Sequence, residues 1–257
     1  MTPSKRILLA SCIFVFLGAC VTGPSQKDIK QAEIRYDLGV GELHGGQFRQ
    51  ALRSFMAAVK VHPDFALAHN GLGLAYMVMG QNQLAETHLK RALELKPDLS
   101  EVLNNLARLY MNQKRFRQAI PLLEKALEDM FLKERYLAES NLGWALFMTG
   151  KQKKGMDRVM TALAQNEKLC VGYLYLGLMY EKRKQYDKSV EELQQLVEYC
   201  PDYPEGLFAL AKVLLLQGNI RAGCRHLASC RDLGRRSQTG RSCQRLIDQN
   251  CEASTDP

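Results

Sequence analysis

The stretch from Ala66 to Leu99, ALAHNGLGLAYMVMGQNQLAETHLKRALELKPDL, decides the fold of this chain. It holds two helical patterns that meet at Gly80 and end at Pro97. Small residues recur where two antiparallel helices must cross closely, and large residues recur where neighbouring helix pairs meet. Counted from Ala66 as position 1, the residues at positions 7, 8, 11, 20, 24, 27 and 32 carry this ladder: Leu72, Gly73, Tyr76, Ala85, Leu89, Ala92 and Pro97.

This ladder resembles the tetratricopeptide repeat (TPR), a helical hairpin of 34 residues. A single hairpin cannot bury its own apolar face, so neighbouring copies are required. Further copies begin at Ala32, Ser100, Tyr136, Cys170 and Pro204. We therefore predict an all-α TPR solenoid of six helical hairpins over residues 32–235, with a capping helix and a frayed tail over residues 236–257.

The turns between the two helices of each repeat give the same register independently. Their spacings are 34, 34, 36, 34 and 34 residues, and a two-residue insertion within 129–134 explains the longer one. Glycine at such a turn allows a left-handed backbone between helices. The six turn residues are Gly46, Gly80, Lys114, Gly150, Lys184 and Gly218. The repeats depart from the consensus at Glu42, at Gly155 and at Gly223.

The first 19 residues read as a lipoprotein signal peptide. Lys5 and Arg6 precede a short apolar run, and the segment ends in Leu17-Gly18-Ala19-Cys20, which resembles the bacterial lipobox. We expect cleavage before Cys20, acylation of that cysteine with chains such as palmitate, and a tether over residues 20–31. Val21 in place of an aspartate favours the outer membrane. An ordinary secretory signal is the competing interpretation.

The positive charge does not indicate a nucleic-acid partner. The formal net charge is +8, and Lys5 and Arg6 leave with the signal. The other basic residues are spread along the helices, with the densest groups at 151–154 and 235–241. Nucleic-acid binding requires a continuous basic stripe with interleaved aromatic residues, and this pattern does not provide one.

Six cysteines remain after the signal Cys12 and the lipidated Cys20 are set aside, and an even number in an exported chain favours disulfides. Cys170 begins one helix of repeat five and Cys200 ends the other, so an antiparallel hairpin brings them together. If the last two helices form a hairpin about Ser237, residues whose numbers sum to nearly the same value face each other. The predicted pairs there are Cys230 with Cys243 and Cys224 with Cys251.

A zinc site is the competing interpretation of these cysteines. Cys224, His226, Cys230 and Cys243 carry suitable sulfur and nitrogen ligands, but they form no Cys-x-x-Cys pair. We therefore expect no metal and no cofactor. Catalytic signatures, such as a phosphate-binding loop or a His-Glu-x-x-His motif, do not occur in the sequence. The prediction is a binding protein and not an enzyme.

The concave surface of the solenoid is the expected binding site. In TPR arrays, the first helix of each hairpin lines this surface, and here most of the lining positions are apolar. Packing between repeats is the competing interpretation for each of them. Trp144, Phe147, Leu174 and Leu178 suggest an exposed apolar patch. The predicted groove consists of Leu67, Asn70, Leu74, Met77, Asn104, Arg108, Met111, Leu137, Trp144, Phe147, Leu174, Leu178 and Phe208.

Two polar features of this groove bear on its ligand. Asn70 and Asn104 could hydrogen-bond the backbone of a bound segment. Arg108 has no partner lysine in repeat two, so the basic clamp with which some TPR proteins bind carboxylate termini is not reproduced. The sequence therefore predicts that the groove binds an apolar segment.

The lipobox, the six repeats and the absence of a catalytic appendage together resemble the type IV pilus pilotins, the PilF, PilW and Tgl group. The segment Asn104-Asn105-Leu106, Tyr110 and the pair Cys170/Cys200 add to the resemblance. It implies an outer-membrane lipoprotein on the periplasmic side that binds secretin subunits and promotes their localisation and multimerisation. The runner-up is a general envelope TPR lipoprotein, a scaffold for outer-membrane assembly or for peptidoglycan enzymes.

Overall fold

The computed structural model describes residues 23–235 and 237–251. The expected signal peptide, Cys20 and the end of the tail lie outside these residues. The described residues fold into thirteen helices. They are α1 (Gln26–His44), α2 (Phe48–Val61), α3 (Ala66–Val78), α4 (Asn82–Leu95), α5 (Ser100–Asn112), α6 (Phe116–Ala126), α7 (Arg135–Met148), α8 (Gln152–Gln165), α9 (Cys170–Lys182), α10 (Tyr186–Tyr199), α11 (Pro204–Leu216), α12 (Ile220–Leu233) and α13 (Gln238–Asn250).

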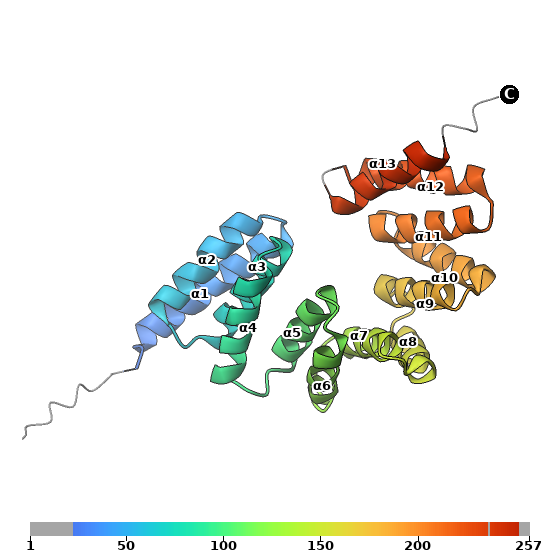
Figure 1. Ribbon diagram of the computed structural model, residues 1–257. Coiled ribbons are helices and arrows are strands. Elements are labelled where there is room, and N and C mark those ends of the chain that lie inside the picture. Colours follow the sequence, from blue (N-terminus) through green and yellow to red (C-terminus); the bar gives the residue numbers. More distant parts are fainter. Residues whose placement is uncertain (1–22, 236, 252–257) are drawn as a thin grey trace, which may run out of the picture.

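The first twelve helices form six antiparallel hairpins that follow one another along an arc (Figure 1). Each hairpin packs on the next, and the first helices of successive hairpins also touch one another from α1 to α11. The odd-numbered helices therefore form the inner side of the arc. The all-α solenoid predicted from the sequence is confirmed. Within the described residues, no helix has the length and apolar character that a membrane span requires.

The six turn residues predicted from the sequence all have a positive φ, between +59° and +96°. Four of them are glycines, which adopt this left-handed conformation without a steric penalty. Lys114 and Lys184 adopt it with φ values of +60° and +59°, although each carries a Cβ atom. The turn geometry thus fixes the repeat register even where the glycine is missing.

Replacing Lys184 by glycine should stabilise the protein. The change removes the steric cost of a left-handed residue with a side chain, and we expect the free energy of unfolding to rise by roughly 0.5–1 kcal/mol. Urea denaturation followed by circular dichroism measures this free energy of unfolding. Glu191→Gly, on an exposed turn of α10, is the control and should lower stability by about 1 kcal/mol. A loss of stability in both variants would contradict this account of the turn.

The first helix begins six residues earlier than the sequence predicted. Ser25 and Asp28 form a capping box, in which the Ser25 hydroxyl accepts from the backbone N–H of Asp28 and the Asp28 carboxylate accepts from that of Ser25. This cap extends the helix into residues 26–31, which the sequence assigned to the tether. The consensus residue Leu38 is 56% exposed and Ile34 is 61% exposed, because no described helix packs on that side of α1.

The same three cysteine pairs that the sequence predicts are joined in the structure: Cys170–Cys200, Cys224–Cys251 and Cys230–Cys243. No thiolate of these six is left for the alternative zinc site. The last two bonds hold α13 against α12, so the predicted capping helix covers the end of the core.

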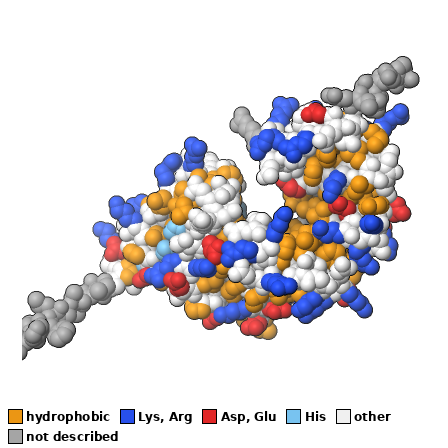
Figure 2. Space-filling view, viewed as in Figure 1, with side chains coloured by type: hydrophobic (Ala, Val, Ile, Leu, Met, Phe, Trp, Pro, Cys, Tyr) orange, Lys and Arg blue, Asp and Glu red, His pale blue; other side chains and the backbone are white. Residues whose placement is uncertain are grey.

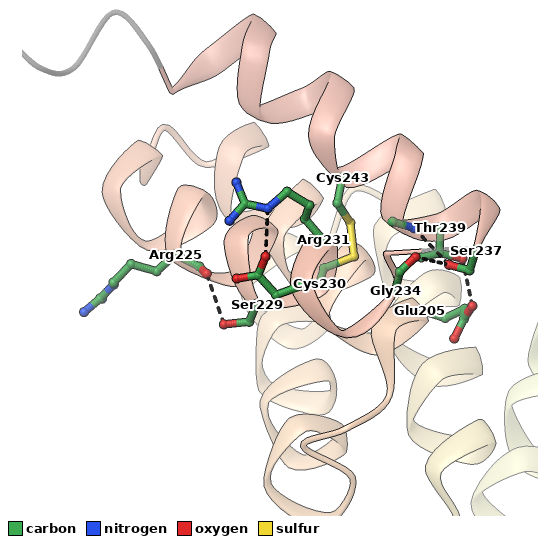
Figure 3. The surroundings of a disulfide bond; sticks show 11 residues. Glu205, Arg225, Ser229, Cys230, Arg231, Gly234, Ser237, Thr239 and Cys243 are labelled. Carbon is green, nitrogen blue, oxygen red and sulfur yellow. Dashed lines mark hydrogen bonds and ion pairs between the residues drawn. A yellow bond between two sulfur atoms is a disulfide. The ribbon is translucent and has the colours of Figure 1, made fainter.

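Polar contacts fix the first turn of α13 beside the Cys230–Cys243 bond (Figure 3). The Ser237 hydroxyl accepts from the Gly240 N–H at 3.1 Å and donates to the Gly234 carbonyl at 2.9 Å. The Thr239 hydroxyl donates to Glu205 on α11 at 2.7 Å. The capping helix is therefore tied to both helices beneath it.

Candidate functional site

The candidate site is the inner face, which we define as the concave surface formed by α3, α5, α7, α9 and α11. Figure 2 shows hydrophobic side chains gathered in the hollow of the arc, with Lys and Arg side chains at its margin. The sequence predicted thirteen lining residues, and the structure divides them by exposure. Arg108 is exposed, and nine are half-buried: Leu67, Leu74, Met77, Asn104, Leu137, Trp144, Leu174, Leu178 and Phe208.

Three of the predicted groove residues lie in the core instead of on the surface. Asn70, Met111 and Phe147 are only 6%, 6% and 5% exposed. Met111 and Phe147 occupy position 12 of their repeats, and Phe147 packs there against Met156 and Met179. Position 12 therefore serves contact between helices and not ligand binding in these repeats.

The apolar patch expected around Trp144 is also smaller than predicted. Leu174 and Leu178 pack against the buried cluster that contains Leu193 and Leu210. The indole of Trp144 stacks on the rings of Tyr175 and Phe147, with centroids 5.1 and 6.2 Å apart. These contacts leave Trp144, Leu174 and Leu178 half-buried between the repeats, while Phe147 is buried.

A hydrogen-bonded ladder of amide side chains crosses the inner face. Asn105 donates to the side-chain oxygen of Asn70 at 3.0 Å, and Asn141 donates to that of Asn104 at 3.1 Å. The Tyr175 hydroxyl then donates to the side-chain oxygen of Asn141 at 3.2 Å. Asn70 and Asn104, which the sequence offered to a bound backbone, therefore bond to neighbouring repeats. The ladder fixes the inner helices relative to one another.

Arg108 is an unpaired cation on this face. Its side chain is exposed and makes no ion pair or hydrogen bond within the described residues. Desolvation by the surrounding protein lowers the pKa of its guanidinium. Desolvation also raises the pKa of the neighbouring Tyr175 hydroxyl, so this phenol is neutral at physiological pH.

An open cleft of about 670 Å³ lies at the edge of the inner face, where α7, α9 and α11 begin. We call it the tyrosine cleft, because Tyr136, Tyr199 and Tyr203 line it together with Leu137, Val171 and the Cys170–Cys200 disulfide. Its volume and its largely apolar walls suit an apolar or aromatic side chain. Leu137 lines the cleft from α7, the inner helix that also carries Trp144.

The insertion before repeat four contributes Glu134, its last residue, to the lining of the tyrosine cleft. Asp129 holds the inserted loop, accepting from the Ser100 hydroxyl at 2.7 Å and from the Phe131 N–H at 2.9 Å. The loop ends at Glu134, whose φ of +52° turns the chain into α7 at the cleft. The sequence predicted the insertion but not the cleft. The 36-residue spacing between two turns reveals that residues are inserted, but it carries no information on the shape they form.

Comparison with protein families matches TPR descriptions to three segments: a tetratricopeptide repeat over residues 64–130, another over 104–165, and a TPR repeat over 172–218. Together these segments cover more than half of the 257 residues. The chain belongs to the tetratricopeptide-repeat family. Such solenoids present their concave surface to protein partners, and this TPR protein has the same geometry.

Among curated proteins, the type IV pilus assembly protein PilF of Pseudomonas aeruginosa is 27% identical over 187 residues, which span 70% of this chain and 74% of PilF. A crystal structure of PilW, described as a widely conserved type IV pilus biogenesis factor, superposes with a TM-score of 0.68 at 21% identity, over 83% of this chain and 98% of PilW. A solved structure of Pseudomonas aeruginosa PilF gives a TM-score of 0.64 at 19% identity, over 86% and 100% of the two chains. The two superpositions establish a shared fold.

Proposed function

We propose that this TPR protein is a type IV pilus pilotin. It is an outer-membrane lipoprotein, anchored through Cys20, that binds secretin subunits and promotes their localisation and multimerisation in that membrane. The observation that carries the proposal is the similarity to PilF, which extends over 74% of the length of that pilus assembly protein. The PilW-like fold supports it.

The inner face gives the proposal a mechanism. In this mechanism, a secretin subunit presents an apolar segment before it assembles, and exposed apolar surface promotes aggregation. The inner face, with the tyrosine cleft at its edge, covers one such segment while the lipid carries the complex to the membrane. Assembly buries the segment in the pore and releases the TPR protein. No covalent step is needed.

The test compares heat- and detergent-resistant secretin multimers in strains with and without this protein. We expect the deletion strain to contain secretin monomer but no multimer, and a plasmid copy to restore the multimer. A second copy that carries Cys20→Ser removes the lipid anchor. We expect the Cys20→Ser protein to be lost from the envelope membrane fraction and to restore the multimer poorly. Immunoblotting should show that its total level is normal.

Unchanged multimers in the deletion strain would refute the pilotin function. They would favour the alternative, a general envelope scaffold. Crosslinking from the inner face would then identify the partner. Normal multimers at the outer membrane with Cys20→Ser would contradict the lipid-dependent step alone.

A further inference from the structure

Two large apolar side chains project from the inserted loop between α6 and α7. Met130 and Phe131 are 79% and 86% exposed, more than any other large hydrophobic residue that the structure describes. Neither side chain therefore fills the tyrosine cleft of its own chain, although Glu134 of the same loop lines that cleft. We call Met130 and Phe131 the knob. Covering the knob would remove a large apolar area from water, which is favourable.

Hydrogen bonds on both sides of the knob hold its backbone in place. Asp129, directly before the knob, accepts from the Ser100 hydroxyl at 2.7 Å and from the Phe131 N–H at 2.9 Å. Arg135, after the loop, donates to the Asp129 carbonyl at 3.2 Å. Because the loop is already ordered, docking the knob against a partner costs less conformational entropy than docking an unordered segment.

The knob and the tyrosine cleft lie on the same edge of the solenoid. The knob belongs to the linker between α6 and α7, and the cleft is lined by residues of that linker and of the α8–α9 and α10–α11 linkers. The cleft volume of about 670 Å³ accommodates a phenylalanine ring together with the neighbouring methionine. A surface that carries both an apolar projection and an apolar hollow is complementary to a second copy of itself, rotated by 180°.

The charges beside the knob and at the cleft are complementary too. Glu128 and Lys133 flank the knob, and Lys168 and Asp202 line the cleft. All four side chains are exposed, and none forms an ion pair within the described residues. Each of the two surfaces therefore offers one unpaired charge of each sign to the other. Opposite charges placed across an interface favour one orientation of the partners.

We infer that two copies of this chain form a symmetric dimer in which the knob of each copy occupies the tyrosine cleft of the other. Lys133 of each copy then pairs with Asp202 of the second copy, and Glu128 pairs with its Lys168. One buried aromatic side chain covers roughly 150–250 Å². Two knobs and the cleft walls that they cover therefore bury on the order of 1,200 Å², the lower end of the range for stable interfaces. The inference goes beyond the proposed function and does not depend on it, since a bound segment would displace the knob from the cleft.

Sedimentation velocity of the full-length chain, over protein concentrations that span the expected dissociation constant, tests the dimer. We expect a monomer–dimer equilibrium with a dissociation constant on the order of 10 μM. Phe131→Ser should raise this constant roughly tenfold or more, because it removes the aromatic part of both knobs. Leu38→Ser is the matched control, because Leu38 is also an exposed apolar residue, at 56%, but lies on α1 in the first hairpin. It should dimerise as the unaltered chain does, and circular dichroism checks the fold of both variants.

An exchange of charges tests whether the knob enters the tyrosine cleft. Lys133→Glu and Asp202→Lys each place like charges together at both contacts of a symmetric dimer. Each change should therefore raise the dissociation constant roughly three- to tenfold. The variant that carries both changes has opposite charges again and should dimerise nearly as the unaltered chain does. Both side chains are exposed, so the fold should not change.

A monomer at every concentration, or an unchanged dissociation constant in Phe131→Ser, would overturn the inference. Loss of the dimer in Leu38→Ser but not in Phe131→Ser would assign self-association to α1 instead. If the variant with both charge changes dimerises as poorly as the two single variants, the tyrosine cleft is excluded as the site that receives the knob. None of these measurements involves secretin, so their failure would leave the multimer test of the proposed function unaffected.

Discussion

Removing the two disulfides of the C-terminal cap should release α13 and destabilise the protein by roughly 2–5 kcal/mol for each bond. Cys230 and Cys243 are fully buried, and α13 covers Leu227 and Ala211 beneath them. The sequence of α13 is mostly polar. Gly240 and Cys243 are its buried residues, and Leu246 and Ile247 are partly buried against the core. The disulfides therefore reinforce a smaller apolar face than the other helices have.

The variant for this test replaces Cys224, Cys230, Cys243 and Cys251 by serine. Hydrogen exchange measures the protection of its amides, and chemical denaturation measures its free energy of unfolding. We expect the amides of α13 to lose protection while those of α9 and α10 keep theirs. The control replaces Cys170 and Cys200, whose bond closes a loop of similar length within repeat five. It should lower global stability without releasing α13. Full protection of α13 in the cap variant would show that packing alone holds this helix.

Replacing Gly155 by alanine should lower the free energy of unfolding by about 2–3 kcal/mol, because it overpacks the crossing of α7 and α8. A Cβ atom at this position would lie 2.6 Å from the Gly143 carbonyl oxygen and 2.7 Å from the backbone nitrogen of Phe147. Both are backbone atoms of α7, so neither can move aside as a flexible side chain does. The two helices would have to separate and disturb the buried cluster around Phe147 and Val159.

Gly41→Ala is the matched control for this effect. Gly41 also lies inside a helix, but a Cβ atom there would meet nothing within 4 Å. Alanine has the higher helix propensity, so we expect a gain of roughly 0.5–1 kcal/mol. Thermal denaturation of both variants gives the comparison. Stabilisation by Gly155→Ala would mean that α7 and α8 tolerate a wider separation than their backbone contacts indicate.

The sequence by itself determined the repeat register, the order of the helices and the cysteine pairs. These features depend on local rules. Apolar spacing sets a helix and its buried face, a left-handed residue at a fixed point ends the first helix of each hairpin, and the antiparallel hairpin then decides which cysteines meet. The consensus departure at Gly155 also has a local reason, since Gly143 lies opposite it across the α7–α8 crossing.

Only the tertiary structure decided what the inner face offers to a partner. Contacts between residues about 35 positions apart, such as Asn70 with Asn105, depend on how far each hairpin rotates relative to the last. That rotation buries Phe147 and leaves Arg108 unpaired in the hollow, although sequence spacing assigns both to the same face. The tyrosine cleft likewise requires the ends of α7, α8, α9, α10 and α11 to meet beside Glu134, the last residue of the inserted loop. Hydrophobic periodicity specifies which side of a helix is buried, but the packing of neighbouring repeats determines which residues of that side remain open.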